Sequence, residues 1–87
     1  QKLNKDLISI CDTVKAPMLG TLYHAPSPKS QPFIKVGKKV KEGDVLFIIE
    51  AMKTMNQVKS DRAGVVKNIL VENGLPVEFN QDLVVIE

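Results

Sequence analysis

The sequence predicts a small all-β domain, a barrel or sandwich of antiparallel strands built from two related halves. Two observations support this fold class. Short runs of β-branched and aliphatic residues, such as 45–49 and 83–86, are separated by Gly, Pro, Asn and Asp. A common pattern of residues also occurs twice along the chain. Because the runs follow one another closely and no crossover helix fits between them, we expect the strands to pair mainly antiparallel.

The repeat is found by aligning residues 14–50 with residues 58–87. Five positions of the first half recur 37 positions later, where Gly37, Val40, Leu46, Ile49 and Glu50 correspond to Gly74, Val77, Leu83, Ile86 and Glu87. Gly20 corresponds to Gly64 at an offset of 44, so the first half holds seven extra residues between Gly20 and Gly37. We assign them to the proline-rich segment of about 25–32, which we expect to protrude as a stiff loop.

The repeat also predicts how the chain is organised in space. Its 87 residues suffice for a single domain, which we place at 14–87, with 1–13 as a linker or N-terminal arm. A pseudo-twofold axis between the halves puts their connection, a hairpin within 51–57, at one end of the domain. The same axis brings Glu87 close to Val14 at the opposite end. Cys11 is the single cysteine, so no internal disulfide forms, which fits a reducing compartment.

Composition and charge exclude several classes of function. The net charge is only +2, and Lys35, Lys38, Lys39 and Lys41 cluster where turn residues predict a solvated loop, so we expect no nucleic-acid partner. Base-stacking aromatics are scarce, with three Phe, one Tyr and no Trp. No apolar run is long enough to span a bilayer, so no membrane partner is expected either. His24 lacks a partner nucleophile or carboxylate at a recognisable spacing, and no metal-ligand cluster is present.

The informative motif is the segment 50–56, Glu-Ala-Met-Lys-Thr-Met-Asn, which follows one apolar strand and precedes another. This placement puts Met52 and Lys53 at or near a hairpin turn. Together with Ala-Pro-Met at 16–18, the glycine pattern and the Pro-Ser-Pro insertion, the motif resembles the biotin carboxyl carrier protein family of acetyl-CoA carboxylase over 14–87. The resemblance implies a flattened barrel-sandwich hybrid of the biotinyl and lipoyl carrier type, with the insertion as a thumb loop.

The resemblance also implies the function. Lys53 would carry biotin, which a biotin protein ligase attaches, biotin carboxylase carboxylates, and carboxyltransferase uses to make malonyl-CoA from acetyl-CoA for fatty acid synthesis. The chain itself would be a non-catalytic carrier subunit, in the bacterial cytoplasm or alternatively the plastid stroma. The residues expected to serve recognition by the ligase and other partners are Glu50, Ala51, Met52, Thr54 and Met55. The thumb residues are Ala25, Pro26, Ser27 and Pro28.

Other interpretations remain open at this point. Thr54 stands where Met or Leu is usual in the family, and Ala25 replaces a frequent threonine, so a thumb contact to biotin would use Ser27 or backbone groups. The thumb is alternatively a plain surface loop, and Met52 and Met55 alternatively pack on the barrel end. A lipoyl carrier shares the fold, but usually has Asp before and Ala after its lysine and lacks a thumb. A small basic β-barrel that binds RNA or protein is the remaining alternative.

Overall fold

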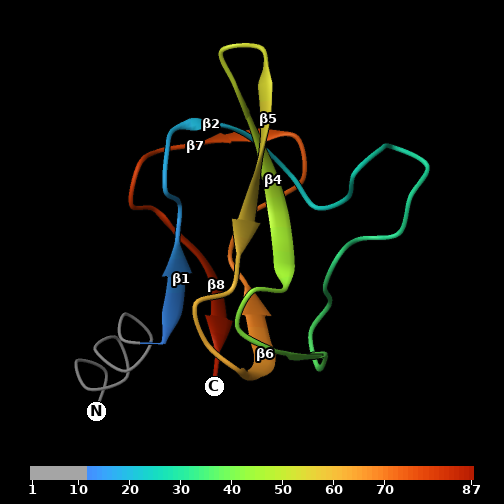
Figure 1. Ribbon diagram of the computed structural model, residues 1–87, viewed down its shortest axis with the longest axis vertical. Coiled ribbons are helices and arrows are strands. Elements are labelled where there is room, and N and C mark those ends of the chain that lie inside the picture. The colour runs from blue at the N-terminus through green and yellow to red at the C-terminus, as the bar shows by residue number, and fades with distance from the viewer. Residues whose placement is uncertain (1–11) are drawn as a thin grey trace.

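The computed structural model describes residues 12–87, and within this range every regular element is a β-strand (Figure 1). The described strands are β1 (Thr13–Lys15), β2 (Gly20–Tyr23), β3 (Lys39–Val40), β4 (Val45–Ala51), β5 (Thr54–Lys59), β6 (Gly64–Ile69), β7 (Leu75–Val77) and β8 (Asp82–Ile86). Residues 1–11, and with them Cys11 and most of the expected arm, lie outside the described residues. No helix between residues 12 and 87 has the length and apolar character needed to cross a membrane.

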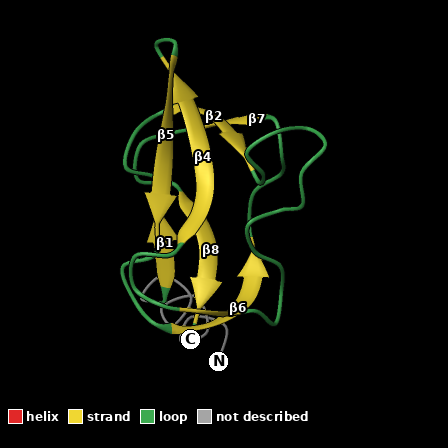
Figure 2. Ribbon diagram, turned by 45° about the vertical axis from the view of Figure 1, so that its right-hand side comes forward, coloured by secondary structure: helices red, strands yellow, loops and turns green. Residues whose placement is uncertain are grey.

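The strands form two four-stranded sheets that face each other (Figure 2). One sheet has the order β1-β8-β6-β3 and the other the order β5-β4-β2-β7. All six strand pairs between residues 12 and 87 are antiparallel. The expected all-β, antiparallel fold is therefore confirmed.

The two halves of the repeat interlock. In four of the six pairs, β1–β8, β2–β7, β3–β6 and β4–β5, one strand comes from each half. Hydrogen bonds repeat in the same way, since Gly37 N donates to Val66 O at 2.8 Å and Gly74 N donates to Leu22 O at 2.7 Å. The two bonds are equivalent, because Gly37 corresponds to Gly74 at the offset of 37 and Leu22 corresponds to Val66 at the offset of 44. Neither half therefore closes its core without the other.

The matching glycines, Gly20 and Gly64, occupy equivalent places where two backbones approach closely. A Cβ at Gly20 would lie 2.5 Å from Glu50 O, and one at Gly64 would lie 2.9 Å from Glu87 O. Since Glu50 and Glu87 are themselves a matched pair, the same steric constraint acts once in each half. Glycine is required there because no side chain fits between the strands.

The core lies between the sheets and is contributed by both halves. Its largest fully buried side chains are Phe47, Leu22, Leu46, Ile49, Leu83, Ile86, Val66 and Val84. In β4 four consecutive residues, 46–49, are buried, so this strand is enclosed on both faces before it runs out toward the hairpin. Burial of this apolar surface is the main contribution to the stability of the fold.

The chain ends of the described range meet at the end of the domain opposite the β4–β5 hairpin (Figure 1). Thr13 pairs with Val85, and Ile86 N donates to Asp12 O at 2.9 Å. This confirms the placement of the ends expected from the repeat. β1 begins at Thr13, one residue before the expected domain boundary.

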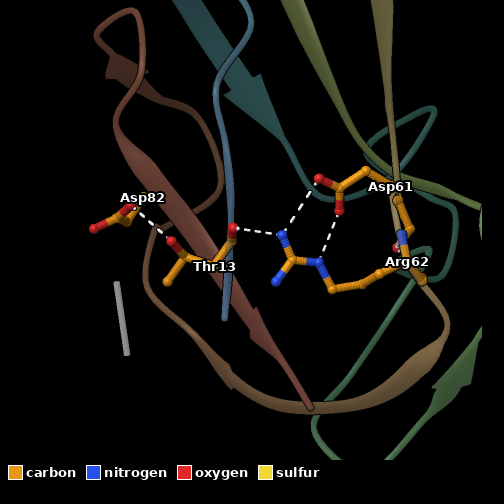
Figure 3. A network of polar contacts seen from close by, with 5 residues as sticks. Thr13, Asp61, Arg62 and Asp82 are labelled. Atoms are coloured by element: carbon orange, nitrogen blue, oxygen red, sulfur yellow. Dashed lines mark hydrogen bonds and ion pairs between the residues drawn. The ribbon is translucent and has the colours of Figure 1, made fainter. Parts of the chain in front are cut away.

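A polar network fixes β1 at this end, and Figure 3 shows it from close by. The Arg62 guanidinium donates to Thr13 O at 3.1 Å and to the Asp61 carboxylate at 2.8 Å. Thr13 Oγ1 donates to Asp82 Oδ1 at 2.9 Å, and the Lys15 ammonium donates to the same oxygen. The bond from Lys15 holds the pKa of Asp82 below its usual value, and the bond from Arg62 does the same for the pKa of Asp61.

Candidate cofactor attachment site

The β4–β5 hairpin is closed by a two-residue turn that consists of Met52 and Lys53. Ala51 pairs with Thr54 across it, so the turn is tighter than the connection of 51–57 expected from the sequence. Met52 and Lys53 have φ angles of 51° and 67°, in the left-handed region that the tight turns of hairpins require. Neither residue is Gly or Asn, the types that adopt this conformation at least cost. The expected position of both residues at the hairpin turn is confirmed.

Side chains of β5 brace the turn from one face of the hairpin. Thr54 Oγ1 donates to Ala51 O at 2.6 Å, and Asn56 Nδ2 donates to Thr54 Oγ1 at 3.1 Å. Asn56 Nδ2 also lies 3.3 Å from Ile49 O, which links the brace to the buried part of β4. The departure at position 54 therefore has a local role, because its hydroxyl closes the turn.

Lys53 lies exposed at the tip (Figure 1), and within residues 12–87 its ammonium makes no recorded hydrogen bond or ion pair. A biotin carboxyl group is joined to protein through an amide, which requires a primary amine on an accessible stem. Lys53 provides that amine in the open, so the residues of the turn fit covalent attachment of biotin.

The other predicted recognition residues fall on two opposite faces of the hairpin. Glu50 and Met55 form a cross-strand pair on the side of the thumb, whereas Ala51 and Thr54 form a pair on the other side. Met52 projects from the turn with 94% of its surface exposed, and Met55 is 56% exposed. Neither methionine is buried against the barrel end.

On the thumb side, the hairpin borders a cavity of about 580 Å³. The thumb residues Ala25, Pro26, Ser27 and Pro28 line one side of it, and Tyr23, Glu50 and Met55 are among the residues lining the rest. Tyr23 OH donates to Glu50 Oε1 at 3.1 Å. This bond is the main cause of the raised pKa of Tyr23, because ionising the phenol would break it and place two negative charges together.

The thumb leaves the sheets after β2 and projects sideways from the barrel (Figure 2). Phe33 N donates to His24 O at 2.8 Å and so closes the base of the loop. His24 N donates to Asn73 Oδ1 at 2.8 Å, and Nε2 lies 3.0 Å from Val71 O, so that nitrogen carries the proton it donates. The imidazole also packs on Phe47 with the ring centroids 5.4 Å apart. His24 therefore anchors the thumb.

The tip of the thumb is held by its two serines. Ser30 N donates to Ser27 O at 3.1 Å, and the two hydroxyls lie 2.8 Å apart. The Ser27 side chain lines the cavity, where its hydroxyl has a second lone pair to offer.

Sequence reasoning missed a second groove on the opposite face of the hairpin. Ala51, Met52, Thr54 and Asn56 line it together with Met18, Leu19 and Phe79, and its volume is about 550 Å³. Leu19 and Phe79 are 64% and 66% exposed. The sequence repeat could have revealed this groove, because the apolar residues Leu19 and Phe79 correspond to Ala63 and Glu42 under the same offsets.

An exposed lysine on a tight turn, carried by two matched β halves, fits a domain with a covalent attachment point. A family model described as "Biotin-requiring enzyme" matches residues 12–86. The chain therefore belongs to the family of biotin-requiring enzymes, whose cofactor is biotin.

Curated relatives make the likeness more specific. The chain is 54% identical over 74 residues to the biotin carboxyl carrier protein of acetyl-CoA carboxylase from Haemophilus influenzae, which covers 85% of this chain and 48% of the relative. It is 52% identical over 75 residues to the chloroplastic biotin carboxyl carrier protein 1 of acetyl-CoA carboxylase from Arabidopsis thaliana, covering 86% of this chain and 27% of the relative. The resemblance drawn from the motif is confirmed, and the chain spans half or less of the length of these relatives.

Solved structures share the fold. The crystal structure of Kluyveromyces lactis urea carboxylase matches with a TM-score of 0.70 at 32% identity, over 86% of this chain and 6% of that one. An aspartoacylase family protein from Mesorhizobium loti matches with a TM-score of 0.64 over 86% of this chain and 24% of that one. Because its identity is only 19%, this second likeness shows the fold alone.

Proposed function

We propose that this chain is the biotin carboxyl carrier domain of an acetyl-CoA carboxylase and that Lys53 is its biotinylated residue. The observation that carries the proposal is the primary amine of Lys53, which is unpaired within residues 12–87 and lies on an exposed two-residue turn. This turn is at the end of the domain opposite the ends of the described range (Figure 1). The names of the relatives from Haemophilus influenzae and Arabidopsis thaliana support the choice of enzyme.

The chain contributes a nucleophile to the attachment reaction, and a biotin protein ligase supplies the activated acid. The neutral Lys53 Nζ attacks the acyl carbon of biotinyl-adenylate, made from biotin and ATP. An amide C–N bond forms, the C–O bond to the phosphate breaks, AMP leaves, and Nζ releases a proton. Since the turn exposes Lys53 and leaves its ammonium unpaired within the described range, no interaction there has to be broken first.

Biotin, once attached, carries a carboxyl group from biotin carboxylase, which uses ATP and bicarbonate, to carboxyltransferase and acetyl-CoA. The chain is non-catalytic in this scheme and serves by tethering, which raises the local concentration of the group to the order of millimolar. We place the domain in a bacterial cytoplasm or a plastid stroma, in keeping with its bacterial and chloroplastic relatives.

The thumb cavity is proposed as the resting place of the attached ring. Met55 and the prolines supply apolar surface, and the hydroxyl of Ser27 supplies a polar partner. Ala25 has no hydroxyl, so the hydroxyls of Ser27 and Ser30 and backbone groups are the partners that the thumb offers. Glu50, Ala51, Met52, Thr54 and Met55 remain the residues proposed for recognition by the partners.

Intact-mass measurement tests the attachment. With a biotin protein ligase, biotin and ATP, the chain should gain one biotinyl group, and peptide mapping should place it on Lys53. Lys53→Arg should gain none and keep the fold, because the tip buries little surface. Lys59→Arg, an exposed lysine on the same hairpin, is the matched control and should be modified like the wild type.

Two results would contradict the proposal. Biotinylation of Lys53→Arg would place the site elsewhere, and modification of the wild type with lipoate, but not biotin, by the corresponding ligases would identify a lipoyl carrier. Addition of biotin carboxylase, carboxyltransferase, ATP, bicarbonate and acetyl-CoA to the biotinylated domain should then yield malonyl-CoA, and failure with this acceptor would assign a different carboxylase.

A further inference from the structure

Several large apolar side chains are exposed along the groove on the hairpin face opposite the thumb. Leu19, Met52 and Phe79 are 64%, 94% and 66% exposed, and Met18 lies between them and the core. Scattered single hydrophobic residues on a surface are ordinary, but several that line one groove mark an interaction site. We call Met18, Leu19, Met52 and Phe79 the hairpin-end patch.

The pseudo-twofold repeat provides an internal comparison for this patch. Its two loops are tied by a hydrogen bond from Asn80 N to Ala16 O of 2.8 Å, and the equivalent bond at the other end of the domain joins Gly43 N to Ser60 O, also at 2.8 Å. The two loops are thus tied in the same way at both ends of the domain, which allows the side chains that they carry to be compared.

The side chains at the two ends differ in polarity. Where the hairpin end has Leu19 and Phe79, the equivalent positions at the terminal end hold Ala63 and Glu42. Met18 corresponds to Arg62, which is engaged in the network around Thr13. The fold therefore does not demand apolar residues in these loops, and their presence only beside Lys53 points to a partner that works there.

We infer that the hairpin-end patch is a docking surface for the ligase that acylates Lys53, an inference that rests on the proposed function. The short length of the Lys53 side chain favours the ligase as the partner that docks here. The ligase acts on Lys53 Nζ, which is separated from the backbone by a four-carbon stem only. Its surface must therefore approach the flanks of the turn, where Met52 and the groove lie. Enzymes that act on the biotin ring work at the end of a longer arm and need no such contact.

A second copy of the chain fits the patch less well. The patch flanks the β4–β5 hairpin on the face away from the thumb, and seven residues line its groove. A standard stable interface takes about 20–30 residues from each partner. A transient contact with an enzyme suits an area of this size. The partner surface is expected to be apolar, because no charged residue lines the groove.

The test exchanges the patch for its counterpart at the other end of the domain. In the variant Leu19→Ala/Phe79→Glu, both positions take the residue found at the equivalent place in the repeat. The control is Val36→Asn, which replaces another exposed hydrophobic residue, 62% exposed and remote from the hairpin, by its counterpart at position 73. Thermal unfolding checks that both remain folded.

Initial rates of biotin incorporation at limiting carrier then measure kcat/KM with a biotin protein ligase. We expect the patch variant to lose about tenfold or more, the scale of losing one or two buried apolar side chains from an interface, and to reach full biotinylation on long incubation. Val36→Asn should stay within about twofold of the wild type. As a second readout, unmodifiable Lys53→Arg should inhibit ligation of the wild type, and adding the patch substitutions should remove that inhibition.

Each other outcome overturns the inference. Equal kcat/KM and equal inhibition would show that the ligase does not use the patch. Normal ligation with slowed carboxylation of the fully biotinylated variant would assign the patch to biotin carboxylase. A wild-type dimer in sedimentation that the variant loses would assign it to a second copy. Absence of biotinylation in the wild type itself would instead refute the proposed function, and the docking surface with it.

Discussion

The left-handed turn at Lys53 predicts that the wild-type hairpin is less stable than the fold permits. Met52 has a φ of 51° and is 94% exposed, so its side chain contributes almost no burial while its backbone is strained. Met52→Gly should therefore stabilise the domain, although most substitutions by glycine destabilise.

The magnitude follows from two opposing terms. An L-residue in the left-handed region costs about 1–2 kcal/mol, which glycine does not incur. Glycine loses about 0.5–1 kcal/mol more backbone entropy on folding. The midpoints of the two ranges give a net gain of about 0.75 kcal/mol, which in a domain of this size raises the melting temperature by about 3–6 °C.

Thermal unfolding followed by circular dichroism measures the shift. Val36→Gly is the control, because Val36 is also an exposed hydrophobic residue, at 62%, but its φ is not positive. It should lower the melting temperature, since glycine there adds entropy to the unfolded chain and relieves nothing. A Met52→Gly variant that melts at or below the wild-type temperature would refute the assignment of strain to this turn.

Three further predictions concern the barrel itself. Gly20→Ala should destabilise more than Gly64→Ala, because the added Cβ would meet backbone oxygen at 2.5 Å rather than 2.9 Å, and urea unfolding should give losses of about 2 kcal/mol or more. Leu22→Ala, at a fully buried position, should cost about 2–5 kcal/mol in the same assay. Lys15 donates a hydrogen bond to Asp82 and holds the pKa of Asp82 below its usual 3.8. The contribution of this carboxylate to the stability of the fold is therefore complete above pH 3.8 and is lost as the pH falls through the lower pKa of the folded state. Asp82→Asn should then lower stability at neutral pH by about 1 kcal/mol and weaken the loss of stability below about pH 4.

The fold was predictable from the sequence because its main determinant is a repeat. The alignment matched Gly20 with Gly64 and Ile49 with Ile86, and the structure shows that each glycine lies against the matched isoleucine of its own half. The strands at 45–49 and 83–86 followed from β-branched runs alone. One partner of each strand also followed, β5 from the expected hairpin and β1 from the pseudo-twofold axis, whereas the pairing with β2 and β6 depends on tertiary packing.

The candidate site was predictable in its centre and not in its surroundings. The motif placed Lys53 at a turn. The two-residue geometry is braced by Thr54 and Asn56, which donate across the hairpin to Ala51 O and Ile49 O, and no local pattern of residues predicts these bonds. The cavity beside the thumb was equally out of reach, since Tyr23 and Glu50 lie 27 positions apart and meet only through sheet register. The hairpin-end patch was within reach, because comparing Phe79 with Glu42 needs only the repeat.

The proposed function requires so small a domain to meet several enzymes, and the division between a rigid hairpin and a flexible side chain fits that requirement. β4 is buried from residue 46 to residue 49 and hydrogen-bonded to β5 as far as Ala51, so the strands carry the order of the core out to the turn. A partner that docks on this end therefore does not have to order a loop, which lowers the entropic cost of binding. The remaining freedom lies in the stem of Lys53 and in whatever is attached to it. Strain at Met52 is consistent with this division, because a turn selected for stability alone would use Asn-Gly, whereas this one keeps a lysine at its tip.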